Sequence, residues 1–141
     1  TCSIGTAQAA LNRSNTYLQE RVQFGEAIAN FQALPFKLAD MATELVAARQ
    51  MIRLAAFKVD QGDPEATAYA AMAKRFATDA GFNICNDALQ LHGGYGSMRE
   101  YPMERYIRDN RVHQILEGTN EIMRVIIARR LLALADLEAI T

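Results

Sequence analysis

Apolar residues recur every three or four positions along most of the chain, which is the spacing of one face of an α-helix. Near the start this spacing predicts a helix over 1–21 with one apolar face, made of Ile4, Ala7, Leu11, Leu18 and Val22. A turn is expected at Gln23-Phe24-Gly25, after which the chain continues to Pro35. No segment shows a convincing strand alternation.

The longest apolar stripe predicts a helix of about six turns from Leu38 to Val59. This helix is expected to end at Gln61-Gly62. The tripeptide Asp63-Pro64-Glu65 then predicts the start of a third helix, because Asp63 is a good N-cap and Pro64 suits the first helical position. Glu65 adds an acidic group to the first turn, where the helix dipole favours one.

The third helix is expected to reach about Leu91, and it is rich in small residues that include Ala70, Ala73, Ala77 and Ala80. Small residues let neighbouring helices approach closely, so this helix is predicted to be buried on more than one side. A glycine-rich break follows at 92–96, then a shorter helix from Pro102 to about Val112 and a last helix over roughly 119–137. Long helices with short connections predict an all-α fold, an up-and-down antiparallel four-helix bundle with an additional short helix.

The 141 residues are enough for one domain with a sizeable core, so 1–141 is predicted to be a single domain. The chain opens inside a helical pattern at Thr1 without a cap, which predicts that it is a fragment of a longer protein. The formal net charge of -1 gives no electrostatic case for nucleic acid, and no apolar run is long enough for membrane insertion. Cys2 and Cys85 lack metal-like spacing and are interpreted as reduced structural thiols.

Glu117 is the main candidate for chemistry, because it stands between the apolar pair Ile115-Leu116 and the flexible Gly118. A carboxylate in an apolar setting holds a proton more tightly, which suits a general base. The helix that begins directly afterwards would place it near free backbone N–H groups. The alternative is a solvated loop acid with no catalytic role.

Two further segments are candidates for anion binding. The run QLHGGYG at 90–96 has more glycines than one helix end requires, and exposed N–H groups along such a run can form an anion-binding surface. Arg21, at the end of the first helix, could form a fork to a phosphate or could only complement the helix dipole. His113 lies four residues before Glu117, but without further ligands a packing role is favoured over a metal pair.

Five separated motifs, taken in order, resemble the C-terminal domain of the acyl-CoA dehydrogenases: ERVQFG, the pair Phe31-Gln32, QLHGGYG, EYPMERYIRD and ILEGTNEIMR. The resemblance covers essentially the whole chain, and its last motif is most similar to the branch of the family that acts on isobutyryl-CoA. It implies a flavoenzyme whose N-terminal helical and middle β-domains are absent from this chain.

The resemblance implies that Glu117 removes the α-proton of a short branched-chain acyl-CoA while a hydride moves from the β-carbon to FAD, giving the 2,3-enoyl-CoA. It also implies FAD contacts at matching positions. Arg21 matches an arginine that reaches the pyrophosphate across a subunit interface, whereas Gln23 departs from the small hydroxyl residue that is common there. The remaining implied FAD contacts are Phe31, Gln32, Gln90, Leu91, His92, Gly93, Gly94, Thr119, Asn120 and Glu121. Arg129 matches a position near the CoA part of the substrate.

As partners the resemblance implies a homo-oligomer built as a dimer of dimers and an electron-transferring flavoprotein as acceptor. It implies a cytoplasmic location in a bacterium and the mitochondrial matrix in a eukaryote. Two alternatives stay open: the chain is a helical oligomerisation module without activity of its own, or it belongs to a relative that acts on a different acyl-CoA.

Overall fold

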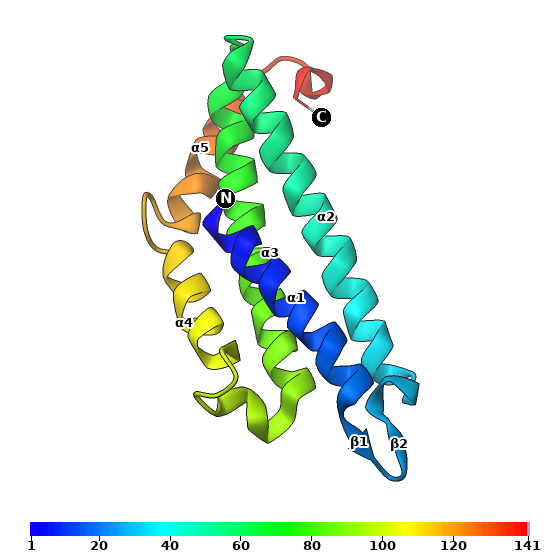
Figure 1. The fold of residues 1–141 in the computed structure, drawn as a ribbon. Coiled ribbons are helices and arrows are strands. Elements are labelled where there is room, and N and C mark those ends of the chain that lie inside the picture. The colour runs from blue at the N-terminus through cyan, green and yellow to red at the C-terminus, as the bar shows by residue number, and fades with distance from the viewer. Residues whose placement is uncertain (141) are drawn as a thin grey trace.

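Helices make up nearly all the regular structure of residues 1–140, which are the residues that the computed structural model describes. The elements in chain order are α1 (Cys2–Glu20), β1 (Val22–Gln23), β2 (Glu26–Ala27), η1 (Ile28–Asn30), α2 (Ala33–Asp60), α3 (Ala66–His92), η2 (Gly93–Ser97), α4 (Met103–His113), α5 (Asn120–Ala133) and η3 (Leu137–Ala139). Figure 1 shows α1, α2 and α3 as successive antiparallel columns, with α4 and α5 following one another along α3 as the fourth column. This confirms the predicted all-α, up-and-down bundle.

Helix α3 lies at the centre of the bundle, in contact with α1, α2, α4 and α5. The sequence explains this position, because most of its buried residues are small. Ala77, Ala80 and Ala88 are almost completely buried, and a Cβ added to Gly81 would lie 2.9 Å from Asn110 Oδ1. The prediction that this helix is buried on more than one side is confirmed.

The larger core side chains fill the spaces that these small residues leave. Leu18 from α1, Met41 and Leu45 from α2, Ile84 from α3 and Met103 from α4 are buried almost completely. Each fully buried side chain of this size stabilises the fold by about 1.5–3 kcal/mol. Within residues 1–140 no helix is long and apolar enough to cross a membrane.

A short antiparallel hairpin follows α1, where the sequence shows no strand alternation. Val22 pairs with Ala27 and Gln23 pairs with Glu26. The turn between them places Phe24 and Gly25 at φ values of 54° and 87°, which Gly adopts readily and Phe does not. The prediction that Val22 belongs to the buried face of the first helix is wrong, because the helix ends at Glu20 and Val22 is 55% exposed.

Two predicted helix ends also differ from the structure. Asp63 is not an N-cap, because its Oδ1 accepts the Glu65 backbone N–H at 2.8 Å within a turn and α3 begins only at Ala66. The last helix ends at Ala133 instead of near Leu137, and the chain leaves it through Leu134 in an extended conformation. In both places a local turn that the apolar spacing does not record replaces the expected helical turn.

Both cysteines are free thiols, as predicted, but only one of them is buried. Burial raises the pKa of Cys85 to about 12, so this thiol stays protonated at physiological pH. Cys2 is exposed at the start of α1, so burial gives no support to the structural role expected for it.

The start of α3 and the end of α5 are joined by one ion pair. Arg130 donates through Nε and Nη2 to the two carboxylate oxygens of Glu65, and the Glu65 side chain is only 10% exposed. The Arg130 guanidinium holds the pKa of Glu65 below its usual range. A two-pronged contact of this kind fixes both side chains, and it ties the last long helix to the central one.

We expect Glu65→Gln to lower the stability of the isolated chain at pH 7, with a loss that disappears in acid. Because the folded state lowers the Glu65 pKa, the stabilisation is present above the usual pKa of about 4.3 and is lost as the pH falls through the folded value. Urea unfolding midpoints of both proteins between pH 7 and about pH 3 measure the difference. Glu104→Gln, which removes an exposed i,i+4 pair with Arg108, is the control and should change the midpoint less. A Glu65→Gln difference that grows on acidification would contradict the assignment.

Candidate functional site

Two cavities lie at different levels along α3. The first, called here the Glu117 cavity, has a volume of about 460 Å³. Its walls come from the start of α1, the C-terminal half of α2, the N-terminal half of α3 and the loop after α4. The wall is mainly apolar, with Ile52, Ala55, Val59, Ala73, Ala77 and Leu116, and its polar groups include Lys74, His113 and Glu117.

Glu117 stands at the edge of this cavity, on the loop between α4 and α5. Its φ of 55° lies in the left-handed region, which a residue with a side chain adopts only at a cost, and Gly118 follows with φ 87°. Within residues 1–140 Glu117 is exposed to solvent, so the desolvated setting expected of a general base is not found, and the exposure agrees with the alternative of a solvated loop acid. The expected apolar wall is present beside it, but nothing in the described residues covers it.

His113 is the last residue of α4, so the continuous helix that would carry both His113 and Glu117 on one face does not exist. The imidazole Nδ1 of His113 instead lies 2.9 Å from the Ser3 hydroxyl on α1. The described residues contain no group of three or more side chains that could hold a metal ion. His113 therefore joins the loop to α1, as the packing interpretation expected.

Lys74 is a part of the cavity wall that sequence reasoning missed. Partial burial lowers the Lys74 pKa, while the nearby carboxylates of Asp79, Glu121 and Glu117 act in the opposite direction. Its Nζ donates to Asn120 Oδ1 at 2.7 Å. A sequence signal was available, because Lys74 and Thr78 are polar positions spaced i,i+4 along an otherwise alanine-rich helix.

The segment after Glu117 has a structural role in this chain. Thr119 is the N-cap of α5, and its hydroxyl accepts the Ile122 N–H at 3.3 Å. The backbone N–H of Glu121 and the Thr119 hydroxyl hold the pKa of the Glu121 carboxyl below its usual range. Asn120 is only 3% exposed, and its side chain is directed into α3. A contact of the Asn120 side chain with a cofactor is therefore not available in this conformation.

The second cavity, called here the Arg21 cavity, has a volume of about 680 Å³ and lies at the other end of α3, beside the hairpin and η2. It brings together seven of the predicted site residues, which come from two distant segments: Arg21, Gln23, Gln90, Leu91, His92, Gly93 and Gly94. A Cβ at Gly93 or Gly94 would meet nothing within 4 Å, so the backbone there is open to an approaching group. An arginine opposite an open glycine backbone suits an anionic ligand.

Aromatic rings form one wall of this cavity, and two of them, Tyr17 and Tyr95, are residues that sequence reasoning did not select. The Arg21 guanidinium lies 5.1 Å from the centre of the Tyr95 ring, a distance suited to a cation–π contact. Tyr17 stacks on His92 at 4.3 Å. Tyr95 stands inside the QLHGGYG motif, so its position next to two glycines was the available signal.

His92 is a buried part of this wall. Its Nδ1 lies 2.7 Å from the Ala88 carbonyl oxygen, and burial lowers the His92 pKa. The ring is therefore uncharged at neutral pH and contributes a flat surface rather than a cation. This geometry gives His92 a packing and hydrogen-bonding role in the wall.

Six of the predicted site residues lie outside both cavities: Thr119, Asn120 and Glu121, described above, and Phe31, Gln32 and Arg129. Phe31 packs against the core and meets Phe24 edge-on at 6.0 Å, and Gln32 is exposed at the start of α2. Arg129 lies on α5 and lines a separate cavity of about 330 Å³ beside the Glu65–Arg130 ion pair. A single chain does not bring these last three residues to Glu117 or to Arg21.

The bundle, with its Glu117 loop and its glycine-lined cavity, is the helical domain of a flavoenzyme family. Residues 1–132 match the family model described as "Acyl-CoA dehydrogenase, C-terminal domain", and the chain belongs to this family. The expected family is thereby confirmed.

Among similar proteins of known name, the bovine mitochondrial isobutyryl-CoA dehydrogenase is 54% identical over 131 residues, which are 93% of this chain and 32% of the relative. A probable acyl-CoA dehydrogenase of Bacillus subtilis is 52% identical over 92% of this chain and 34% of the relative. A 3-(aryl)acrylate reductase of Clostridium sporogenes is 48% identical over the same shares. The chain thus spans about a third of the length of these relatives.

Solved structures agree in fold. Butyryl-CoA dehydrogenase from Megasphaera elsdenii superposes with a TM-score of 0.89 at 42% identity, covering 92% of this chain and 34% of the other. The FAD complex of PigA superposes with a TM-score of 0.87 at 33% identity, covering 92% and 33%. A chain in the structure described as the electron transferring flavoprotein of Acidaminococcus fermentans gives a TM-score of 0.89 at 46% identity, covering 95% and 34%.

The left-handed backbone at Glu117 leads to a stability prediction. The left-handed conformation costs an ordinary residue about 1–2 kcal/mol, and Asn tolerates it better than most. We expect Glu117→Asn to keep or raise the unfolding free energy of the isolated chain, and Glu117→Val to lower it by about 1 kcal/mol or more, because a β-branched side chain fits this conformation poorly. Urea unfolding of both variants measures this, and equal losses would show that the residue leaves the left-handed region in solution.

Proposed function

We propose that this chain is the C-terminal helical domain of a longer, FAD-dependent acyl-CoA dehydrogenase in which Glu117 is the catalytic base. The observation that carries the proposal is the position of Glu117. It stands in a strained backbone conformation at the edge of a mainly apolar cavity. It also occupies the place in ILEGTNEIMR that matches the family's catalytic glutamate. Strained backbone beside a cavity is typical of functional sites.

The proposed role of Glu117 is to take the α-proton of the acyl-CoA thioester. An α-C–H is a weak acid, so its base works best when it is ionised, near the proton and shielded from water. The apolar wall formed by Leu116, Ile52 and Val59 suits an acyl chain, and Glu117 lies at its edge. When FAD is bound, it supplies the acceptor for the hydride that leaves the β-carbon, and the product is the 2,3-enoyl-CoA.

The residues of the Arg21 cavity fit the anionic part of FAD. The Arg21 guanidinium can bind a pyrophosphate in a fork, and the open backbone at Gly93-Gly94 allows a ligand to approach closely. The flat ring of Tyr95 is close enough to hold the guanidinium in place. These residues would hold the cofactor, and Gln23 would line the same site.

The two cavities lie apart on one chain, and the family resemblance implies that the arginine matching Arg21 reaches FAD across a subunit interface. Thr78 in the wall of the Glu117 cavity and Gln90 in the wall of the Arg21 cavity lie about 18 Å apart along α3, at 1.5 Å per residue. In the proposed homo-oligomer, a dimer of dimers, Arg21 would serve the FAD of one active site and Glu117 would act in another. Phe31 and Gln32, which lie in neither cavity, would contact the neighbouring subunit's FAD. The segment Thr119–Glu121 would lie beside the flavin next to its own Glu117.

For the substrate we propose a short branched-chain acyl-CoA, with isobutyryl-CoA as the first candidate. The bovine and Dictyostelium discoideum isobutyryl-CoA dehydrogenases, at 54% and 52% identity, support this choice. Arg129 would lie near the CoA part of the substrate. The proposed electron acceptor is an electron-transferring flavoprotein, and the proposed compartment is the bacterial cytoplasm or the mitochondrial matrix.

Two alternatives keep specific support. The 3-(aryl)acrylate reductase among the relatives contains a similar segment but is named for another substrate. Measuring activity on a series of acyl-CoA substrates distinguishes this alternative from the proposed one. The second alternative, an oligomerisation module without activity, draws on exposed apolar side chains of α2 such as Phe57 and Val59. Light scattering tests it, because a strict monomer would exclude an assembly role.

We expect Glu117→Gln in the complete enzyme to slow flavin reduction by isobutyryl-CoA by about 10²–10⁴-fold while FAD stays bound, because the amide cannot accept the α-proton. Anaerobic stopped-flow absorbance of the flavin measures the rate, and the absorbance ratio of flavin to protein measures the cofactor. Glu44→Gln, an exposed acid on α2, is the control and should keep the normal rate. A normal rate for Glu117→Gln would exclude this residue as the base.

A further inference from the structure

The loop that carries Glu117 is closed at its neck by a backbone hydrogen bond. The Asn120 N–H donates to the Gln114 carbonyl oxygen at 3.0 Å, so residues 114 and 120 are held together while Glu117 stands at the middle of the segment between them. The Glu117 side chain is exposed, so its position depends on this backbone more than on packing of the side chain itself.

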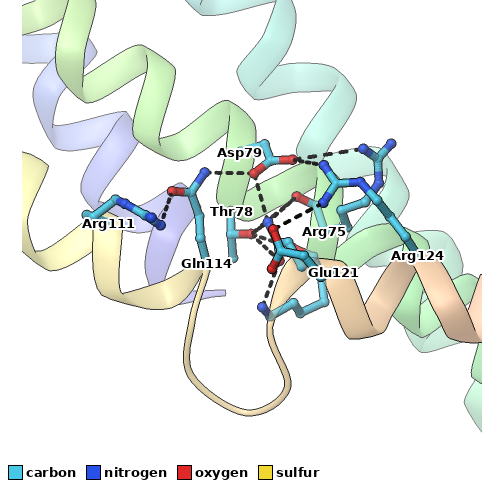
Figure 2. A network of polar contacts seen from close by, with 9 residues as sticks. Arg75, Thr78, Asp79, Arg111, Gln114, Glu121 and Arg124 are labelled. Carbon is cyan, nitrogen blue, oxygen red and sulfur yellow. Dashed lines mark hydrogen bonds and ion pairs between the residues drawn. The ribbon is translucent and has the colours of Figure 1, made fainter.

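Asp79 of α3 joins the two sides of this neck on the side opposite the tip of the loop. Its Oδ1 accepts the Gln114 Nε2–H at 2.7 Å and the Asn120 Nδ2–H at 2.7 Å (Figure 2). One carboxylate oxygen therefore binds the residue that opens the loop and the residue that closes it. The other oxygen, Oδ2, lies 3.9 Å from Arg75 Nη1 and 3.8 Å from Arg124 Nη2.

Each of the two amides is also held at its other end by a cation. Arg111 Nη1 donates to Gln114 Oε1 at 2.9 Å, and Lys74 Nζ donates to Asn120 Oδ1 at 2.7 Å. The amide groups cannot flip without exchanging acceptors for donors on both sides. The side chains therefore form one chain of contacts with Asp79 in the middle, in the order Arg111, Gln114, Asp79, Asn120 and Lys74.

Because Asn120 is buried, its side-chain amide needs hydrogen-bond partners within the protein. Asn120 is 3% exposed, and its Nδ2 also donates to the Thr78 hydroxyl at 2.9 Å. Removing the acceptor of a buried amide leaves a polar group whose desolvation is not compensated. Without Asp79, Asn120 Nδ2 would keep the Thr78 hydroxyl and the Arg75 carbonyl oxygen, which is 3.4 Å away, but no side chain would tie Asn120 to Gln114 through one oxygen.

We propose that Asp79 is a positioning residue that fixes the backbone of loop 114–120 and, through it, the place of the Glu117 carboxylate. The proposal rests on the proposed role of Glu117 as the base. Asp79 lines neither the Glu117 cavity nor the Arg21 cavity, so it acts through Gln114 and Asn120 rather than on the substrate. A base displaced by about 1 Å can lose about 10²-fold in rate, so a rigid neck matters for the reaction.

The test compares Asp79→Ala with the wild type in the complete FAD-containing enzyme. We expect faster deuterium exchange of the peptide that spans 114–120, because the Asn120 N–H loses its protection. We also expect the limiting rate of flavin reduction by isobutyryl-CoA to fall by about 10- to 100-fold, with the half-saturating acyl-CoA concentration changed by less than about threefold. Asp79→Asn keeps an oxygen that can accept both amides, so it should restore most of the rate and of the protection.

Asp87→Ala is the matched control. Asp87 lies on the same helix with a similar side-chain exposure, 34% against 32% for Asp79, and its ion pair with Lys37 of α2 does not involve the loop. It should change neither exchange at 114–120 nor the limiting rate. A purely structural role of Asp79 would lower the FAD content or the thermal stability of Asp79→Ala and leave the rate per bound flavin unchanged, and that result would overturn the proposal.

Deuterium exchange at 114–120 and the rate of flavin reduction together distinguish a failure of this proposal from a failure of Glu117 as the base. If Glu117→Gln reduces its flavin at the normal rate, the assignment of the base fails, and the exchange data alone then decide whether Asp79 holds the loop. If Glu117→Gln is slow but Asp79→Ala exchanges and reacts like the wild type, the base stands and the positioning role is wrong.

Discussion

The close packing of α3 against its four neighbouring helices determines how the whole bundle is arranged. Alanine and glycine at its buried positions let α1, α2, α4 and α5 all approach it, and Leu18, Met41, Leu45 and Met103 fill the remaining space. Larger side chains at Ala77 or Ala80 would push these helices apart, because interiors of this density do not absorb extra volume cheaply. Every feature of the candidate site is built on this helix or held against it.

The middle and the C-terminal end of α3 carry different parts of the proposed chemistry. Its C-terminal end continues into the open glycine backbone opposite Arg21, and its middle holds the Glu117 loop through Asp79, Thr78 and Lys74. A stiff helix keeps these groups at a fixed separation. In the proposed enzyme, Glu117 is at the edge of its cavity because the substrate has to reach it, and bound acyl-CoA would provide the dry surroundings that the described residues do not.

The sequence was sufficient to predict the helices and their antiparallel order, because apolar spacing records which face of a helix is buried. It was also sufficient to group Arg21 with Gln90–Gly94, since the motifs of the family resemblance link these distant segments. The sequence did not predict the turns at Asp63 and Val22, which stand where helix was expected. It also did not predict the exposure of Glu117, because exposure depends on what packs over the loop. The role of Asp79 is not visible in the sequence, since it arises only when Gln114 and Asn120 are brought to one oxygen.

In the proposed homo-oligomer, each bundle supplies Arg21 to one active site and Glu117 to another. The direct measurement is the activity of mixed oligomers, formed from complete chains carrying Arg21→Ala and complete chains carrying Glu117→Gln, assayed without added FAD. Each variant alone should be inactive, whereas pairing the two gives one site with both intact residues. A random mixture should therefore recover about a quarter of the wild-type activity. A mixture no more active than the separate variants would contradict the account, because both residues would then belong to the same site.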